Sequence, residues 1–164
     1  MSDVTDRFGL PFILPGQAQK ELFHNEALAR IDVALHPAIE GVAAVPPAEL
    51  SLGQCWIVAA GASEDWAGKG EMLASWSEGG WRFVAPQPGM LVWNKPATVW
   101  TYWSGTAWSG GELPAAGIRI GGVQVVGERQ PHVPSPSGGT VIDAEARTAI
   151  ASITAALMSH GLLE

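Results

Sequence analysis

Residues 76–81 read Trp-Ser-Glu-Gly-Gly-Trp, and residues 103–108 read Trp-Ser-Gly-Thr-Ala-Trp. In both stretches, two tryptophans enclose four small or turn-prone residues. Side chains that lie opposite each other on antiparallel strands pack together, so this spacing predicts two short hairpins with cross-strand tryptophan pairs. Two copies are too few for a solenoid, and the repeat is therefore a local one.

The strand pattern extends outward from these hairpins over residues 41–130. Further apolar stretches of strand length are separated by turn residues, and they cover 54–59, 90–93, 98–103 and 118–126. All eight tryptophans of the chain lie between Trp56 and Trp108. We therefore predict a small Trp-rich antiparallel β-domain over residues 41–130.

Residues 1–40 are predicted to form an arm followed by a helix. Prolines and a glycine interrupt the apolar residues of positions 1–15, which disfavours helical structure there. An apolar arm without helical structure must dock on something, either its own domain or a neighbouring subunit. We expect this segment to serve attachment or assembly.

A helical pattern runs from Gly16 to His36 and ends at Pro37, because the residue before a proline avoids helical angles. Glu26 and Arg30 stand four positions apart, the favourable order for an ion pair on a helix. Apolar residues at intervals of three and four positions predict one buried face. The members of that face are Ala27, Leu28, Ile31, Ala34 and Leu35.

The last part of the chain is predicted to be a linker followed by a helix. Residues 131–140 are rich in proline and glycine, which makes them extended and poor in regular structure. Residues 141–164 then form a helix that Asp143 can cap. Gly161 provides a left-handed end, after which Leu162 can fold back on Leu157.

The terminal helix carries an apolar stripe with heptad spacing. Its members are Ala146, Ile150, Ile153 and Leu157. Isoleucine at both core positions shifts parallel coiled coils from dimers toward trimers or tetramers. The alternative is an ordinary amphipathic helix folded onto its own domain. The separating linker favours assembly, and we predict a homotrimer with this helix near the threefold axis.

Aromatic rings on a β-surface can stack on the apolar faces of sugars, which makes the rings of the hairpins candidate glycan contacts. The candidate residues are Trp66, Trp76, Trp81, Tyr102, Trp103 and Trp108. The competing interpretation is that a small sheet with few Ile, Leu and Phe side chains uses tryptophan as core filler or subunit contact. We expect most of the rings to be buried and a few to remain exposed.

No spacing in the sequence corresponds to a catalytic motif or a metal site. The four histidines and the single Cys55 stand apart from one another, and no glycine-rich phosphate loop opens a helix. The best argument for an enzyme is a glycosidase-type use of Glu64, Asp65 or Glu78, although a Ser-Glu-Asp turn is usually a solvated loop. We expect no enzyme, no metal and no cofactor.

Composition narrows the classes of partner. The net charge is −7 and the nine Lys and Arg residues are scattered, which disfavours nucleic acid and anionic membrane surfaces. No apolar run approaches the roughly 18 residues that span a bilayer, and the polar first residues do not resemble a secretory signal. Charged residues make up 15% of the chain, below the usual quarter, so copies of the chain or a partner are expected to cover part of the surface.

A resemblance to a known family adds to these observations. The stretch from Phe8 to Asp32, the run Ser51-Leu-Gly-Gln-Cys-Trp-Ile-Val, the segment around Trp66 and the end that begins at Val141 resemble an uncharacterised domain family. That family occurs in prophages and gene-transfer agents of alphaproteobacteria. Its members look like virion tail-fibre or tail-tip proteins and are commonly trimeric. No catalytic residues are established for it, so none are transferred.

Together these points predict an α+β protein that is a structural component of a phage or phage-like particle. We expect a trimeric tail-fibre or tail-adhesion protein, made in the bacterial cytoplasm and located in the virion. Its expected partners are copies of itself, other tail proteins and host surface polysaccharide. The alternative is a carbohydrate-binding adhesion module that uses exposed tryptophans.

Overall fold

The computed structural model describes residues 3–13 and 20–164, and the fold is α+β, as predicted. The chain divides into two compact units, Met1–Leu113 and Pro114–Glu164. The sequence placed residues 118–126 in the Trp-rich domain, but their two strands pair only with each other, and they lie in the second unit. The two units are described separately below.

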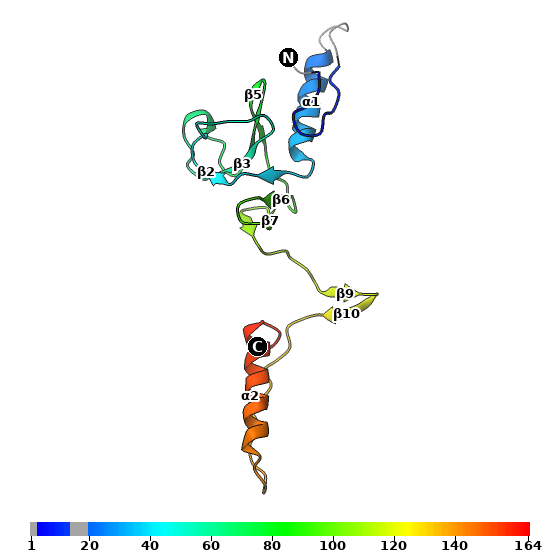
Figure 1. The fold of residues 1–164 in the computed structure, drawn as a ribbon, viewed down its shortest axis with the longest axis vertical. Helices are drawn as coiled ribbons and strands as arrows, with labels where there is room; N and C mark the ends of the chain where they lie inside the picture. The colour runs from blue at the N-terminus through cyan, green and yellow to red at the C-terminus, as the bar shows by residue number, and fades with distance from the viewer. Residues whose placement is uncertain (1–2, 14–19) are drawn as a thin grey trace. The chain divides into compact units, whose positions relative to one another are not determined.

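The first unit contains helix α1 and two four-stranded sheets (Figure 1). Helix α1 spans Lys20–Ala34. One sheet has the order β1-β6-β7-β8 and is formed by Ala38–Ile39, Leu91–Asn94, Val99–Trp103 and Trp108–Gly110. The other has the order β2-β3-β4-β5 and is formed by Val42–Ala43, Cys55–Val58, Leu73–Ser77 and Gly80–Val84. A 3-10 helix, η1, spans Glu64–Trp66.

Both tryptophan-bracketed hairpins form in the predicted register. Trp76 pairs with Trp81 across β4 and β5, and Trp103 pairs with Trp108 across β7 and β8. In the first hairpin Ser77 pairs with Gly80, which leaves a two-residue turn, and Gly80 has a φ of 92° that favours glycine. The five-residue separation of the tryptophans in the sequence therefore correctly predicted the pairing of β4 with β5 and of β7 with β8.

Strand β3 is buried on both faces, which explains its uninterrupted apolar sequence. On one side, Cys55, Ile57 and Leu73 pack with Val33 of α1 and Val92 of the other sheet. On the other side lies a second cluster, whose buried members are Trp56, Val58, Trp66 and Ala74. Burial raises the pKa of the Cys55 thiol to about 12, so this cysteine is a packing residue at neutral pH.

The predicted buried face of α1 is wrong. Ile31 and Leu35 are exposed, whereas Ala29, Asp32 and Val33 are buried. The arm lies beside α1 (Figure 1), and the backbone N–H of Arg7, 25 positions before Asp32, donates to the Asp32 carboxylate. The predicted Glu26–Arg30 ion pair is present at 2.9 Å. The predicted first turn, residues 16–19, lies outside the described residues.

The arm is anchored to its own helix by hydrogen bonds to Asp32. The Asp32 carboxylate accepts hydrogen bonds from Thr5 Oγ1 at 2.7 Å, from the backbone N–H of Arg7 at 3.0 Å and from that of Phe8 at 2.7 Å. The Phe8 side chain stays exposed. Residues 14 and 15 of the predicted arm lie outside the described residues.

Arg7 also completes the end of α1. Its guanidinium donates to the backbone carbonyls of Asp32, Val33, Leu35 and His36 at 2.6–3.2 Å. The last carbonyls of a helix lack partners within the helix, and a cation is favourable at this negative end of its dipole. The last turn of α1 contains no basic residue, so the arm supplies that charge.

The second unit consists of a β-hairpin and a helix. Strands β9, Ile118–Ile120, and β10, Val123–Val126, form an antiparallel pair. Helix α2 spans Ala144–Ser159 (Figure 1). The backbone of Gln130 pairs with the end of the chain at Leu163, the only buried residue among positions 114–164.

The predicted capping residues of α2 are confirmed, although the helix spans Ala144–Ser159 rather than the whole of residues 141–164. The Asp143 carboxylate accepts a hydrogen bond from the backbone N–H of Ala146 at 2.8 Å. Gly161 has a φ of 70°, and the N–H of Leu162 reaches the carbonyl of Leu157 at 3.0 Å. These contacts satisfy orphan backbone groups at both ends of the helix. Residues 131–139 have no regular structure, as the proline and glycine pattern predicts.

Among the described residues, no helix is both long enough and apolar enough to cross a membrane.

Candidate functional site

Three features of the described residues are candidates for function: the tryptophan surface, the stripe on α2 and a cavity beside α1. The first four tryptophans form one continuous cluster. Trp66 is completely buried, with its ring centre 5.0 Å from that of Trp81 and 6.2 Å from that of Trp56. Trp76 lies against the other side of Trp81 at 5.1 Å. Edge-on and tilted packing of this kind is favourable for aromatic rings.

The other four tryptophans form two cross-strand pairs in the second sheet. The ring centres of Trp93 and Trp100 are 5.2 Å apart, and those of Trp103 and Trp108 are 5.4 Å apart. Trp108 Nε1 donates to the carbonyl of Glu71 at 2.8 Å, which ties the end of one sheet to the other. Trp100 is the most exposed of the eight, at 40%.

The six candidate glycan contacts therefore differ in how much of each ring is exposed to a ligand. Trp66 and Trp103 are buried, and their rings present no face to a ligand within this chain. Trp76, Trp81, Tyr102 and Trp108 are half-buried. Sequence reasoning did not select Trp100, because the alternation of a strand cannot tell which of its faces is covered. Most rings are thus engaged in packing, and the exposed tryptophan surface is small.

The apolar stripe of α2 is largely exposed. Ile150 is 43% exposed, Ile153 is 61% exposed and Leu157 is 37% exposed, and Ala146 is exposed as well. No residue of the helix is buried. The sequence predicted these four residues as the oligomerisation face, and the structure places them on one side of the helix, where none of them is buried.

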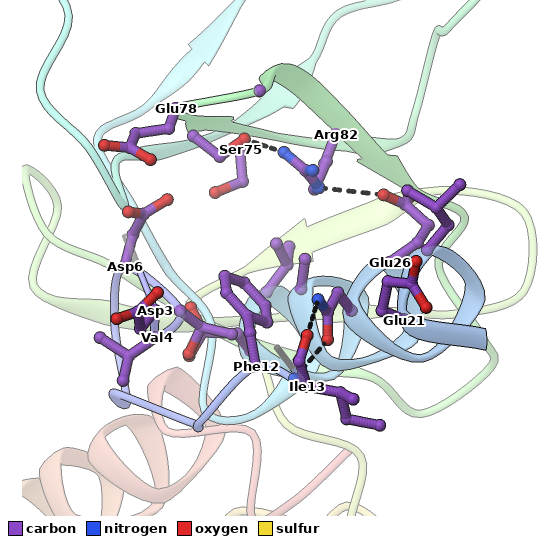
Figure 2. Close-up of a pocket in the computed structure, with 18 residues that line it drawn as sticks. Asp3, Val4, Asp6, Phe12, Ile13, Glu21, Glu26, Ser75, Glu78 and Arg82 are labelled. Atoms are coloured by element: carbon purple, nitrogen blue, oxygen red, sulfur yellow. Dashed lines mark hydrogen bonds and ion pairs between the residues drawn. The ribbon is translucent and has the colours of Figure 1, made fainter. Parts of the chain in front are cut away.

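The cavity lies between the arm, α1 and the β4–β5 hairpin, and its volume is about 790 Å³ (Figure 2). Its floor is apolar and includes Val4, Phe12 and Ala29. Six carboxylates line it, and Figure 2 shows Asp6 and Glu78 at one side with Glu21 and Glu26 at the other. No sequence pattern predicted this cavity, because its walls come from segments far apart in the chain.

Arg82 is the cation that lines this cavity. Its Nε lies 3.2 Å from Glu26 Oε2, and a second nitrogen donates to the Ser77 hydroxyl. Glu26 also binds Arg30, so it is already paired twice. One oxygen of Glu21 is buried without a hydrogen-bond partner. The cavity can therefore accept hydrogen bonds and balance positive charge.

Burial raises the pKa of the Asp6 carboxyl above its ordinary value, and the like charges of Asp32 and Glu78 raise it further. Arg82 and a hydrogen bond from the Glu78 backbone act in the opposite direction. Because the native state holds this proton more tightly than the unfolded chain does, ionisation of Asp6 destabilises the fold. This loss of folding stability is absent well below pH 3.8, where Asp6 is protonated in both states, and it reaches its full size above the raised pKa.

The variant Asp6→Asn is expected to raise the melting temperature at pH 7, because it removes this charge and keeps an oxygen that can accept the Glu78 bond. The gain should stay below about 1 kcal/mol, since water screens an exposed carboxylate. It should shrink toward zero as the pH falls to about 3. Thermal unfolding from pH 3 to 8 measures it, with Glu49→Gln as the control outside the cavity. A gain that grows in acid would contradict the assignment.

The structure brings no catalytic group together from the residues considered for an enzyme. Glu64 and Asp65 are exposed on η1, and Glu78 lies apart from them at the cavity. Ser75 and Ser77 in the cavity wall donate to the carbonyls of Gln54 and Gly80. Across residues 3–13 and 20–164, no three histidine, cysteine or acidic side chains are arranged to hold a metal ion.

The comparisons with known proteins give one finding. A family model described as "Protein of unknown function (DUF2793)" matches residues 24–109. The matched region covers most of α1 and nearly all of both sheets of the first unit, and it includes all eight tryptophans. No curated protein matches the chain.

Proposed function

Since the chain belongs to the DUF2793 family, whose function is unknown, we propose a role for it from its own features: a homotrimeric structural component of a phage or phage-like particle. The class that fits best is a tail-fibre or tail-adhesion protein. The first unit forms the body, with the arm fixed to it, and α2 joins the three chains. The virion is the proposed location, and other tail proteins are the proposed neighbours.

The observation that carries this proposal is the largely exposed stripe of α2. A 16-residue helix is marginal in water unless its apolar face is packed, yet this one buries no residue in its own chain. Isoleucine at both heptad core positions favours three or four strands over two. The positions that flank the stripe carry a single charge, so the helices can approach closely; these positions are Arg147, Ala149, Thr154 and Ala156.

The virion part of the proposal rests on the resemblance of residues 8–32, and of the segments around Trp66 and Val141, to prophage and gene-transfer-agent tail proteins. The low content of charged residues, and the engagement of most tryptophans in packing, favour a structural protein over an enzyme. Particles purified from a strain that carries the gene test this part directly. The chain should copurify with tails and be lost from them when the gene is deleted, and its absence from the particles would contradict the proposal.

The self-association part predicts that Ile153→Glu abolishes the trimer. A carboxylate at the centre of a threefold apolar seam cannot be paired, so it should raise the dissociation constant more than about 100-fold. Sedimentation velocity at micromolar concentration should give three times the 17.2 kDa chain mass for the native protein and one chain mass for the variant. The matched control is Ala155→Glu, which lies on the opposite side of the same helix. A native protein that sediments as a monomer would reject the trimer.

A carbohydrate-binding adhesion role is the second candidate, and the exposed ring of Trp100 favours it. Trp100 packs edge-on against Trp93, so one rigid ring stays available at the surface of the β6–β7 pair. Glycan-array binding by the native protein, reduced in Trp100→Ala and unchanged in the control Leu52→Ala, an exposed apolar residue outside the β6–β7 pair, would support this role. An intact protein that binds no glycan would remove it.

A further inference from the structure

The β9–β10 hairpin has one apolar face and one polar face. Its turn is Gly121-Gly122, with φ values of 56° and 82°, the conformation that a two-residue hairpin turn requires. Ile120 pairs with Val123 and Ile118 pairs with Val126, and paired residues share a face. These four β-branched side chains therefore form one surface of the hairpin, called here the hairpin face.

The opposite surface of the hairpin is polar and internally bonded. Arg119 pairs with Gln124, and the Arg119 guanidinium donates to Gln124 Oε1 at 3.4 Å. Alternation separates the two kinds of side chain along β9, and a shift in register between Gln124 and Val126 of β10 brings Val126 opposite Ile118. One apolar face and one polar face are typical of a hairpin that is buried on its apolar side.

Within the described chain, the hairpin face is open. Ile118 is 53% exposed, Ile120 and Val123 are each 67% exposed, and Val126 is 36% exposed. An isolated two-stranded hairpin is at best marginally stable in water, and a contiguous exposed apolar patch marks an interaction site. The hairpin also leaves both of its outer strand edges without partners in the described sheets.

The features of the second unit identify the occupant as further copies of the same chain. Residues 114–164 carry three arginines and four carboxylates, a net charge of −1, so identical units can meet without strong repulsion. Leu163 is their only buried residue, and the helix of the same unit has a core pattern typical of self-association. A unit of 51 residues that lacks a core of its own can gain one by combining with its copies.

We propose that the hairpin faces of three chains pack against one another, so that the trimer interface consists of β9–β10 as well as α2. This inference rests on the proposed homotrimer and adds a second, β-structured contact to it. The interface would then combine the stripe of α2 with Ile118, Ile120, Val123 and Val126, and the polar pair Arg119–Gln124 would face solvent.

Two neighbouring substitutions test the proposal, because they place the same carboxylate on opposite faces of one strand. Val123→Glu is expected to raise the trimer dissociation constant at least 10-fold in sedimentation equilibrium, and Gln124→Glu is expected to leave it within 2-fold. A Val123→Glu protein that dissociates like the native trimer would overturn the inference while leaving the helix-based trimer intact. A native protein that is already a monomer would instead reject the proposed function itself.

Cysteine cross-linking gives a second measurement that does not depend on a disruptive charge. The native Cys55 is completely buried and its pKa is raised to about 12, so it stays inert under mild oxidation. Val123→Cys should form a disulfide-linked pair of chains, seen at twice 17.2 kDa on a non-reducing gel, and Gln124→Cys should not. Equal cross-linking by both variants would overturn the inference, because the hairpin face would then make no selective contact between chains. Protection of Val123→Cys from alkylation in a monomer would also overturn it, because another surface of the same chain would then cover the hairpin face.

Discussion

Replacement of Trp66 by alanine is expected to reduce the free energy of unfolding of the first unit by about 3–5 kcal/mol. The side chain is completely buried between Trp56 and Trp81, and it comes from the short η1 helix rather than from a strand. Its removal leaves a cavity that the rigid neighbouring rings cannot fill. Urea unfolding followed by circular dichroism measures the loss, because the tryptophan fluorescence of this protein mixes eight signals.

Two further variants separate packing from other effects at this position. Trp66 Nε1 is buried without a hydrogen-bond partner, so Trp66→Phe loses ring area but also removes an unsatisfied donor. It should therefore cost clearly less than Trp66→Ala. Trp100→Ala serves as the exposed control and should cost clearly less than Trp66→Ala, since Trp100 is already 40% exposed. Equal losses for Trp66→Ala and Trp100→Ala would show that burial does not determine the role of these rings.

Loss of the Asp32 carboxylate is expected to release the arm and to cost about 3 kcal/mol. Asp32→Ala leaves the Thr5 hydroxyl and two backbone N–H groups without their common acceptor. Hydrogen exchange should show faster exchange at the amides of Arg7 and Phe8, together with the loss of stability. The Arg7 guanidinium should also lose its hydrogen bonds to the carbonyls at the end of α1, because these bonds and those to the Asp32 carboxylate require the same position of the arm.

The matched variants for this prediction are Asp32→Asn and Asp3→Ala. Asparagine keeps one oxygen acceptor at position 32, so it should retain part of the protection at the arm amides. Asp3 is an exposed carboxylate of the same arm, and its removal should leave the exchange of Arg7 and Phe8 unchanged. Unchanged amide exchange in Asp32→Ala would contradict the proposed anchoring of the arm.

The elements that the sequence predicted well are those specified by neighbouring residues. The bracketing tryptophans fix the β4–β5 and β7–β8 pairings, because a hairpin brings together residues that are already close in the chain. Asp143 and Gly161 define the ends of α2 for the same reason. The α+β class followed from these local patterns.

What the sequence could not show depends on contacts between distant residues. The buried face of α1 contains Asp32, a charged residue that periodicity assigns to solvent, because its partners come from the arm. The cavity and the raised pKa of Asp6 likewise need three segments to converge. The sequence predicted residues 118–126 only as a strand segment. Its apolar face became apparent once the pairing of β9 with β10 across the Gly121-Gly122 turn was known.

Residues 38–43 join the two sheets of the first unit, and this has a consequence for the order of folding. Ala38 pairs in parallel with Trp93 of β6, 55 positions away, and Val42 pairs in parallel with Ile57 of β3. Hairpins such as β4–β5 close locally and can form within microseconds, whereas parallel pairs require the closure of longer loops. The short strands β1 and β2 should therefore be added last, and they should add to both sheets at once. In a refolding experiment, the hairpin amides should be protected early. The amides of Trp93 and Ile57, which donate to the carbonyls of Pro37 and Gly41 beside β1 and β2, should gain protection together in a single late step.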